Sequence, residues 1–224
     1  MRLGYTSTWS MPWGEVQAGQ VRAGIHKEIA EAVAQRLGQP LVFVLLPQRR
    51  PGEPDRPPAF DLGCGMDPSW FAEPQQFHWS EPLFDTSDQL LGHASQPEPA
   101  TLAALRKGTR VGTVRSYHYP TLQVRLGKGE LRREDALDQA SVLAKLVRQR
   151  SDVAVASPQS IAWFMRQQPQ AAQAVAPWRL KVQESAYHCA VPRSSPVDAQ
   201  RVLEAVQALK RDGEIARILA RYAP

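Results

Sequence analysis

The stretch Phe77-His78-Trp79-Ser80-Glu81-Pro82-Leu83-Phe84 decides the fold, together with the apolar run Phe60-Asp61-Leu62-Gly63-Cys64-Gly65-Met66 that precedes it. The earlier run is typical of a short strand that ends in a glycine turn. Pro82 fixes its own φ and drives Glu81 toward extended geometry, which excludes a helix here. The two segments therefore predict a strand and a turn, followed by a rigid crossing strand.

The first 46 residues have the pattern of a strand, a helix and a second strand. Residues 3–6 form a short apolar run, and a loop rich in Pro, Ser and Gly follows at 7–14. After Gly24 an apolar residue recurs every fourth position as far as Leu37, and Gly38 suits the end of that helix. Residues 41–46 are apolar without alternation, which predicts a strand buried on both faces. This order implies a parallel pair with a right-handed crossover.

Further elements follow in the same alternating fashion, except at residues 47–59, where five prolines predict a solvated loop with polyproline character. Ser157 and Pro158 are placed to begin a helix, as cap and first-turn residue. The remaining expected helices lie at 99–107, from 115, at 141–150 and after 157, and two more close the chain with Asp212-Gly213 between them. The remaining expected strands lie at 109–114, 152–156, 180–183 and 187–191.

The composition of the chain argues against several classes of function. The chain has 224 residues, 43% of them hydrophobic, and a formal net charge of +5 from 27 Lys and Arg against 22 Asp and Glu. The basic residues are scattered and no aromatic residues are interleaved with them, so a nucleic-acid partner is not expected. No apolar run approaches the ~20 residues that span a bilayer. The chain opens directly on its first strand, and we expect a mature form without a signal peptide.

The ordered set of these motifs resembles the type 2 periplasmic solute-binding proteins, amino-acid-binding branch. The likeness runs from Arg2 to Ala223 with one break at the proline loop. It rests on the Arg36-Leu37-Gly38 helix end, the Asp-Leu strand with its Gly-Met turn, the Ser-acid-Pro segment and the Asp212-Gly213 ending. The resemblance implies a two-lobed α/β fold, each lobe a mixed sheet flanked by helices. Lobe 1 would comprise residues 1–92 and 187–224 and lobe 2 residues 93–186, joined by two hinge strands.

The resemblance also implies a function. A protein of this family captures a small polar solute between its lobes, closes by a hinge motion and delivers the solute to a membrane permease. We therefore expect a periplasmic, monomeric binding protein without catalytic residues or cofactor. Two alternatives stay open: a ligand-sensing module for a signalling partner, and an enzyme resembling cyclohexadienyl dehydratase. The five histidines form no metal-binding pattern, and no metal site is expected.

Residues expected to contact the ligand lie at strand ends and helix starts, where such folds place their sites. The resemblance places four segments there. The predicted ligand-binding residues are Trp9, Trp13, Gly65, Met66, Asp67, Trp70, Arg115, Ser116, Tyr117 and Ser157.

The chain departs from the family at the charges that hold an α-amino acid. The family's carboxylate-binding arginine would fall near Ala72 or Glu73, and its ammonium-binding aspartate at Ser157. Asp67 stands where the family usually has Thr or Ser, and a carboxylate there repels a ligand carboxylate. Pro68 cannot donate an N–H, so Asp67 is expected to lack a local cap and to face the cleft. The sequence thus predicts a ligand that is not an α-amino acid held in the usual way.

The ligand class stays open. The tryptophans beside Asp67 suit an organic cation, a sugar or an aromatic ring, although each of them can equally be a packing residue. Arg115 can bind an anion or remain a solvated side chain on a turn. Cys64 and Cys189 are expected to lie on neighbouring antiparallel strands, but since the sequence does not fix the register, two buried free thiols are favoured over a bridge.

Overall fold

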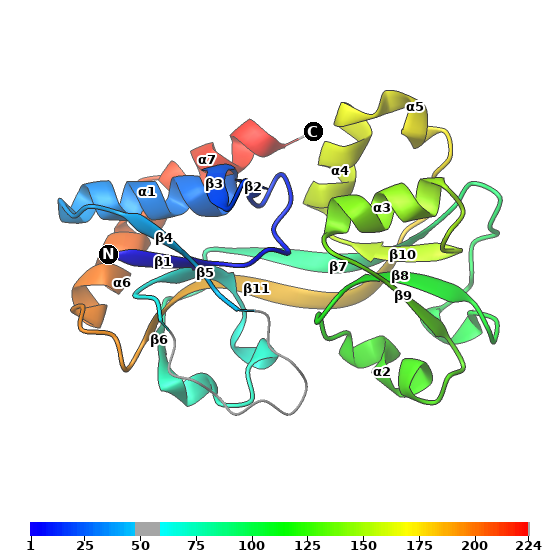
Figure 1. Ribbon diagram of the computed structural model, residues 1–224, viewed down its shortest axis with the longest axis horizontal. Helices are drawn as coiled ribbons and strands as arrows, with labels where there is room; N and C mark the ends of the chain where they lie inside the picture. The colour runs from blue at the N-terminus through cyan, green and yellow to red at the C-terminus, as the bar shows by residue number, and fades with distance from the viewer. Residues whose placement is uncertain (48–58, 224) are drawn as a thin grey trace. The chain divides into compact units, whose positions relative to one another are not determined.

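The computed structural model describes residues 1–47 and 59–223, so most of the expected proline loop lies outside the described residues. The chain divides into two compact units, coloured in chain order in Figure 1. Unit 1 comprises Met1–Asp85 and Ala186–Ala223, and unit 2 comprises Thr86–Ser185. The two strands β7 (Phe84–Gly92) and β11 (Leu180–Pro192) each run from one unit into the other. The two-lobed α/β fold with two connecting strands is confirmed.

Unit 1 opens with the expected strand, helix and strand. β1 (Arg2–Tyr5) pairs in parallel with β4 (Val42–Leu45), and α1 (Ile25–Leu37) connects them. The buried face of α1 carries the four-residue repeat from Ile25, and Gly38 ends the helix with φ 64° while its N–H bonds to the last carbonyls. The loop after β1 leads into a hairpin that the sequence did not predict, β2 (Glu15–Gln17) and β3 (Gln20–Ala23). Its strands are only three and four residues long, too short for their alternation of polar and apolar residues to predict them.

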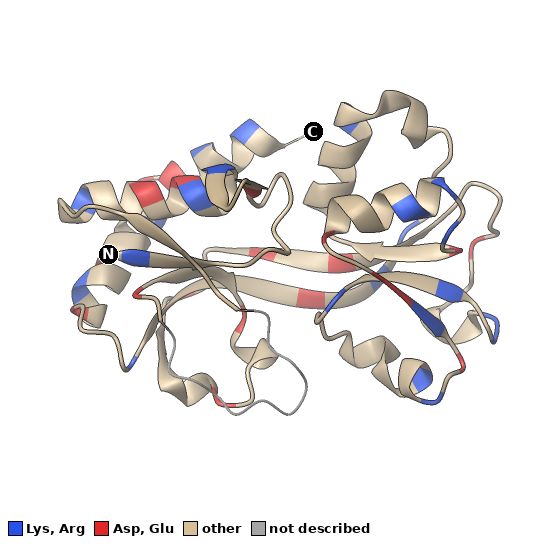
Figure 2. Cartoon of the chain, viewed as in Figure 1, with Lys and Arg blue, Asp and Glu red and all other residues tan. Residues whose placement is uncertain are grey.

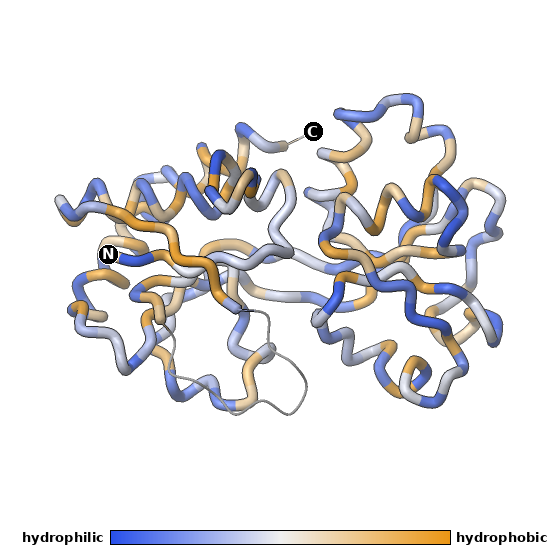
Figure 3. The backbone as a smooth tube through the Cα atoms, in the orientation of Figure 1, coloured by the Kyte–Doolittle hydropathy of each residue, from blue (hydrophilic) through white to orange (hydrophobic). Residues whose placement is uncertain are grey.

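The prediction that residues 41–46 are buried on both faces is wrong. Val42 and Leu45 are 57% and 53% exposed, although the segment is as apolar as a core strand (Figure 3). Within the described residues β4 pairs with β1 alone, so it is an edge strand. An unbroken apolar run shows that a strand is hydrophobic, but it does not show how many other strands pair with it.

The strand expected at the Asp-Leu segment begins only after it, as β5 (Gly63–Met66), and the expected Gly-Met turn lies within this strand. β5 is antiparallel to β11 and places Cys64 opposite Cys189. β6 (Phe77–Trp79) pairs with the end of the same strand. The two cysteines form a disulfide with their Cα atoms 4.0 Å apart. The predicted strand pairing is therefore confirmed, whereas the favoured expectation of two free thiols is wrong, because the register places the two side chains directly opposite one another.

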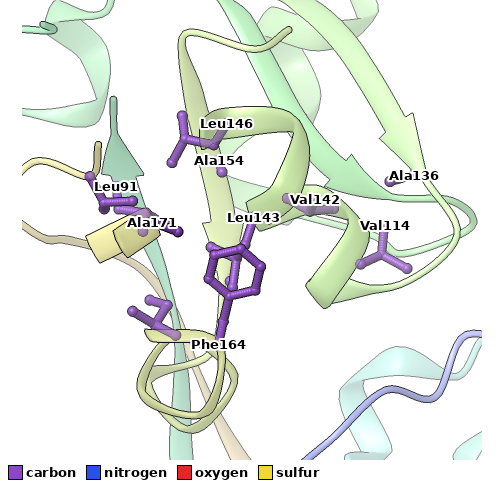
Figure 4. Packing of buried hydrophobic residues seen from close by; sticks show 12 residues of the cluster. Leu91, Val114, Ala136, Val142, Leu143, Leu146, Ala154, Phe164 and Ala171 are labelled. Carbon is purple, nitrogen blue, oxygen red and sulfur yellow. The ribbon is translucent and has the colours of Figure 1, made fainter. Parts of the chain in front are cut away.

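Unit 2 is built on β10 (Val153–Ala156), which pairs with β7 on one side and with β8 (Arg110–Val114) on the other. β9 (Arg132–Ala136) extends the sheet beyond β8. Helices α3 (Gln139–Val147) and α4 (Pro158–Gln167) cover one core (Figure 4), which also includes Leu91, Val114 and Ala154. A second core contains Tyr119, which precedes α2 (Pro120–Gly127), and Leu122 of that helix.

Several boundaries in unit 2 differ from the sequence predictions. The predicted strands at 180–183 and 187–191 form one strand, β11. The helix expected at 99–107 is the single turn η3 (Leu102–Ala104), and α2 begins at Pro120 and not at Arg115. β9 was not predicted, because its sequence Arg-Arg-Glu-Asp-Ala is charged and gives no apolar alternation.

Short helical segments complete the fold: η1 (Pro68–Trp70) and η2 (Pro74–Gln76) in unit 1, and α5 (Pro169–Ala172) in unit 2. The chain closes with α6 (Ala199–Arg211) and α7 (Glu214–Tyr222), separated as expected at Gly213. Basic and acidic residues are scattered over helices and strands of both units (Figure 2). No helix among the described residues is long and apolar enough to cross a bilayer.

Candidate functional site

A set of aromatic rings gathers around Tyr187 in unit 1. Trp13 stacks on Tyr187 with ring centroids 4.8 Å apart, and Phe84 stacks on the same ring at 4.9 Å. His26 stacks on Trp13 at 5.5 Å, and Trp9 lies 4.7 Å from His26. We call these five residues the aromatic stack. Its members come from the loop after β1, the start of α1 and the unit 1 ends of β7 and β11, so tertiary packing assembles it.

Backbone hydrogen bonds hold the 7–14 loop on the first turn of α1. The amide of Ile25 donates to Pro12 O at 2.9 Å, and that of His26 donates to Trp13 O at 3.0 Å. The Gly24 amide donates to the hydroxyl of Tyr222 at 3.1 Å. These bonds use N–H groups that are otherwise free at a helix start. This end of α1 therefore holds the protein's own loop and offers these donors to no anion.

His26 is the buried polar group of the stack. Its side chain is 4% exposed and its Nδ1 has no hydrogen-bond partner. Burial lowers the pKa of His26 to about 3, so the imidazole is neutral at ordinary pH. Gly65, with φ +74°, lies against this ring, and a Cβ at that position would come within 2.1 Å of His26 Cε1. The glycine of the predicted turn is thus required both for its backbone conformation and for close approach of the ring.

Asp67 does not match its prediction. The side chain is 9% exposed and caps η1, accepting hydrogen bonds from the Ser69 amide at 2.8 Å and the Ser69 hydroxyl at 2.6 Å. It also accepts from the Ala186 amide on β11 at 2.9 Å. Although burial opposes ionisation, these hydrogen bonds and the nearby His188 hold the pKa of Asp67 below its usual value. The expectation of an uncapped carboxylate is wrong, because Ser69 supplies the N–H that Pro68 lacks.

The remaining predicted residues of unit 1 differ in exposure. Trp70 is 46% exposed, and its ring meets Tyr187 edge-on at 6.2 Å. Trp9 and Met66 are partly buried, whereas Trp13 is 5% exposed. Trp70 is therefore accessible to solvent and Trp9 is accessible in part, while Trp13 supports Tyr187 from within the stack.

In unit 2 the predicted residues Arg115, Ser116 and Tyr117 form an exposed loop between β8 and α2. Ser116 has φ +67°, and the Tyr117 amide closes the turn on Val114 O at 3.2 Å. Arg115 has no ion-pair partner within the described part of unit 2. The amides of Ser116 and His118 likewise donate to no acceptor that the structure describes. The loop combines an exposed guanidinium with two available N–H groups, a combination suited to an anionic group.

Ser157 also lies in unit 2 and is 4% exposed. As predicted it caps α4, since its hydroxyl accepts from the Ser160 amide. Its own amide donates to Gln139 Oε1 at 2.9 Å, and its hydroxyl lies 3.0 Å from the same oxygen. These contacts explain the residue as a helix cap.

Three members of the stack were not predicted as site residues: His26, Phe84 and Tyr187. Gly65 is the signal that points to His26 and Tyr187, since a glycine within a strand indicates a neighbour too close for a Cβ. Within the described residues, no three His, Cys, Asp or Glu side chains are grouped as metal ligands.

No protein-family profile matches the chain, and no curated protein matches it. Solved structures do. An ancestral arginine-binding protein bound to arginine superposes with TM-score 0.76 at 19% identity, over 99% of this chain and 96% of that one. The substrate-binding protein of an amino acid ABC transporter gives TM-score 0.72 at 17% identity, over 99% and 98%.

A histidine kinase sensor domain with similarity to periplasmic binding proteins gives TM-score 0.74 at 18% identity, over 100% of this chain and 97% of that one. All three similarities span nearly the whole of both chains. They confirm that this chain has the fold of the type 2 periplasmic solute-binding proteins.

Proposed function

We propose that the chain is an extracytoplasmic solute-binding protein whose ligand is a small organic anion with a planar or apolar part. The fold supports the binding role, because similar folds over the full length include proteins described as binding amino acids. The exposed ring surface of Trp70 and Trp9 supplies a platform for the planar or apolar part. The Arg115 loop supplies the anion-binding groups.

The observation that carries the ligand class is the contrast between two charges. Asp67 already accepts three hydrogen bonds from the protein, so it has little capacity left for a ligand cation. Arg115 is exposed and carries no carboxylate partner within unit 2 as described. An organic cation was one of the ligand classes left open while Asp67 was expected to be free, and the capping of Asp67 shifts the balance toward an anion.

The proposal also excludes the usual grip on an α-amino acid. Ala72 and Glu73, near the place of the family's arginine, supply no positive charge, and Ser157, in the place of its aspartate, is neutral and occupied as a cap. A ligand held here by its carboxylate therefore does not depend on an α-ammonium group. Keto acids, hydroxy acids and aromatic acids fit this description better than amino acids.

A thermal-shift screen tests the function. The parent protein and Arg115→Ala are each melted with amino acids, polyamines, betaines, sugars and organic acids. At a hundredfold excess over its Kd, a ligand adds about 2.7 kcal/mol to the stability. We expect a carboxylic acid to raise the Tm of the parent and to have a smaller effect on Arg115→Ala. Stabilisation by polyamines or standard amino acids alone would overturn the ligand class.

The partner is the second part of the proposal. One similar structure belongs to an ABC transporter and another to a histidine kinase sensor, so delivery to a permease and ligand sensing are both supported. We propose delivery to a permease, as the similar structure described as the substrate-binding protein of an amino acid ABC transporter suggests. Cross-linking in membranes of the source cell, with and without the ligand, followed by mass spectrometry, decides between them. Capture of a kinase and not a permease would favour the sensor.

A further inference from the structure

Arg133 lies on β9, outside every segment predicted to bind ligand, yet it makes two hydrogen bonds to the Arg115 loop. Its Nη2 donates to the carbonyl of Val114 and to that of Tyr117, each at 2.9 Å. These carbonyls belong to the first and last residues of the turn that contains Arg115 and Ser116. One nitrogen thus bridges both ends of the turn.

The guanidinium of Arg133 is itself fixed. Its Nε donates to Asp135 Oδ1 at 2.7 Å, and the same oxygen accepts from the hydroxyl of Thr113 at 2.9 Å. Thr113 lies on β8 and is fully buried, so the carboxylate has a rigid anchor. The orientation of Arg133 is therefore set by the sheet and not by the exposed loop that it contacts.

A second contact comes from Tyr119. The guanidinium carbon of Arg133 lies 5.7 Å from the centre of the Tyr119 ring. This ring is 1% exposed, and its hydroxyl accepts a hydrogen bond from the Val114 amide at 3.1 Å. Both the carbonyl and the amide of Val114, where the loop begins, are thus held by one connected group of side chains.

The loop needs this support. Ser116 adopts the left-handed conformation, which is unfavourable for a residue with a Cβ and persists where surrounding contacts maintain it. The Tyr117 bond to Val114 O is the turn's own hydrogen bond, and at 3.2 Å it is longer than either Arg133 bond. Without Arg133, the turn would rely on that bond and on the amide of Arg115, which donates to Ala136 O at 2.9 Å.

We propose that Arg133 is a positioning residue that holds the 115–118 loop in the conformation in which Arg115 and the Ser116 and His118 amides bind an anion. This inference rests on the proposed function of the loop. Arg133 need not touch the ligand, because it acts through two carbonyls. Lysine cannot replace it, since an ammonium group lacks the planar fork that reaches three oxygens in fixed directions.

The test uses Arg133→Lys, which keeps the charge, with Arg132→Lys as its matched control. Arg132 is the preceding residue of the same strand and is exposed. Backbone order parameters from ¹⁵N relaxation report the loop, and a titration with inorganic phosphate reports its anion site. In the parent we expect rigid values of about 0.85 at Ser116 and Tyr117, falling below about 0.6 in Arg133→Lys and unchanged in Arg132→Lys.

Phosphate should shift the Ser116 and His118 amide signals in the parent and require about tenfold more anion in Arg133→Lys, because small displacements of binding groups cost much affinity. Asp135→Asn, which weakens the anchor of Arg133, should change both measurements in the same direction. Unchanged order parameters in Arg133→Lys would overturn the proposal. If phosphate shifts neither amide in the parent, the anion site of the proposed function fails, and the order parameters still decide whether Arg133 holds the loop.

Discussion

The two candidate surfaces are built in opposite ways. In unit 1, the ring contacts of the aromatic stack join segments from both ends of the chain. The disulfide and the hydrogen bond from Ala186 to the capped Asp67 join further segments of the same unit. In unit 2, one short exposed loop presents its groups, and hydrogen bonds from β9 hold it. Substitutions around the stack should therefore alter stability together with binding, whereas substitutions of loop side chains should alter binding alone.

Loss of the disulfide should have the largest effect. The bridge closes a segment of 125 residues between Cys64 and Cys189, and the chain-entropy relation gives about 5 kcal/mol for a loop of that size. We expect Cys64→Ala/Cys189→Ala to unfold at a clearly lower urea concentration than the oxidised parent. The unreduced parent, unfolded, should show no free thiol on titration. A loss of less than about 1 kcal/mol would mean that the bridge contributes little to the assembly of unit 1.

Gly65→Ala should destabilise unit 1 strongly. The residue has φ +74°, and its new Cβ would meet His26 and also Tyr187 Cε1, at 2.8 Å. Overpacking of this kind and the unfavourable backbone together should reduce the unfolding free energy by about 3 kcal/mol. Gly129→Ala in unit 2 is the matched control, since φ there is +68° with nothing within 4 Å, and it should lose about 1 kcal/mol. Equal losses at the two sites would contradict close packing at His26.

Lowering the pH should change the stability contributions of a buried group in unit 1 and a buried group in unit 2 in opposite directions. The pKa of His26 is about 3 in the folded chain and 6.5 in the unfolded chain, so between these values the unfolded state binds more protons. Its contribution is complete above pH 6.5 and falls as the pH is lowered, by about 2 kcal/mol at pH 5. His26→Phe should remove this loss, as urea unfolding at pH 7 and pH 5 would show. His118→Phe, at an exposed histidine of unit 2, should leave it unchanged.

In unit 2, Asp88 should act in the opposite direction. Burial raises the pKa of Asp88 to about 6, against 3.8 in the unfolded chain, and Gln183 donates to its carboxylate at 2.8 Å. Between pH 3.8 and 6 the folded state binds more protons, so this contribution is greatest at low pH and is lost as the pH rises. Asp88→Asn should therefore make the parent's loss of stability on acidification steeper. A shallower loss in Asp88→Asn would contradict the raised pKa.

Asp67→Asn should lower the unfolding free energy by about 1–2 kcal/mol, in contrast to the neutral effect that an uncapped cleft carboxylate would show. The amide can retain the bonds from Ser69, but its NH₂ group cannot accept from the Ala186 amide. Urea unfolding measures the loss, and Asp85→Asn, at an exposed aspartate of unit 1, is the control. Identical stability of Asp67→Asn and the parent would return Asp67 to the candidates for ligand contact.

The sequence was sufficient to predict the elements that depend only on residues close together in the chain. The four-residue repeat and Gly38 predicted α1, and Ser157 with Pro158 predicted the start of α4. Asp67 was mispredicted within the reach of local rules, because its cap comes from Ser69, two residues on; its third hydrogen bond, from Ala186, comes from 119 positions away and could not be predicted locally. The disulfide has the same origin, since a one-residue change of register would have separated the two cysteines.

The candidate site was predicted in its segments but not in its assembly. Gly65, Trp70 and the Arg115 loop were named from the family resemblance, and they remain predictions as ligand contacts. His26 and Tyr187 were missed because each reads as an ordinary member of its helix or strand, and only tertiary packing stacks them. Arg133 was missed for a similar reason, since a charged strand gave no signal of its own.

Of these substitutions, Arg115→Ala should have the smallest effect on stability, and it should have a large effect on ligand binding. Its side chain is exposed on a turn, and such substitutions usually change the unfolding free energy by no more than about 0.5 kcal/mol. A charge-assisted hydrogen bond to a ligand contributes about 1.5–3 kcal/mol, so affinity for the acid found in the screen should fall about 10- to 100-fold. Calorimetric titration measures the affinity, with Arg106→Ala at another exposed arginine of unit 2 as the control. If Arg115→Ala binds that acid as tightly as the parent, the guanidinium is a solvated side chain, and the division between a stability-bearing surface in unit 1 and a binding-only loop in unit 2 does not hold.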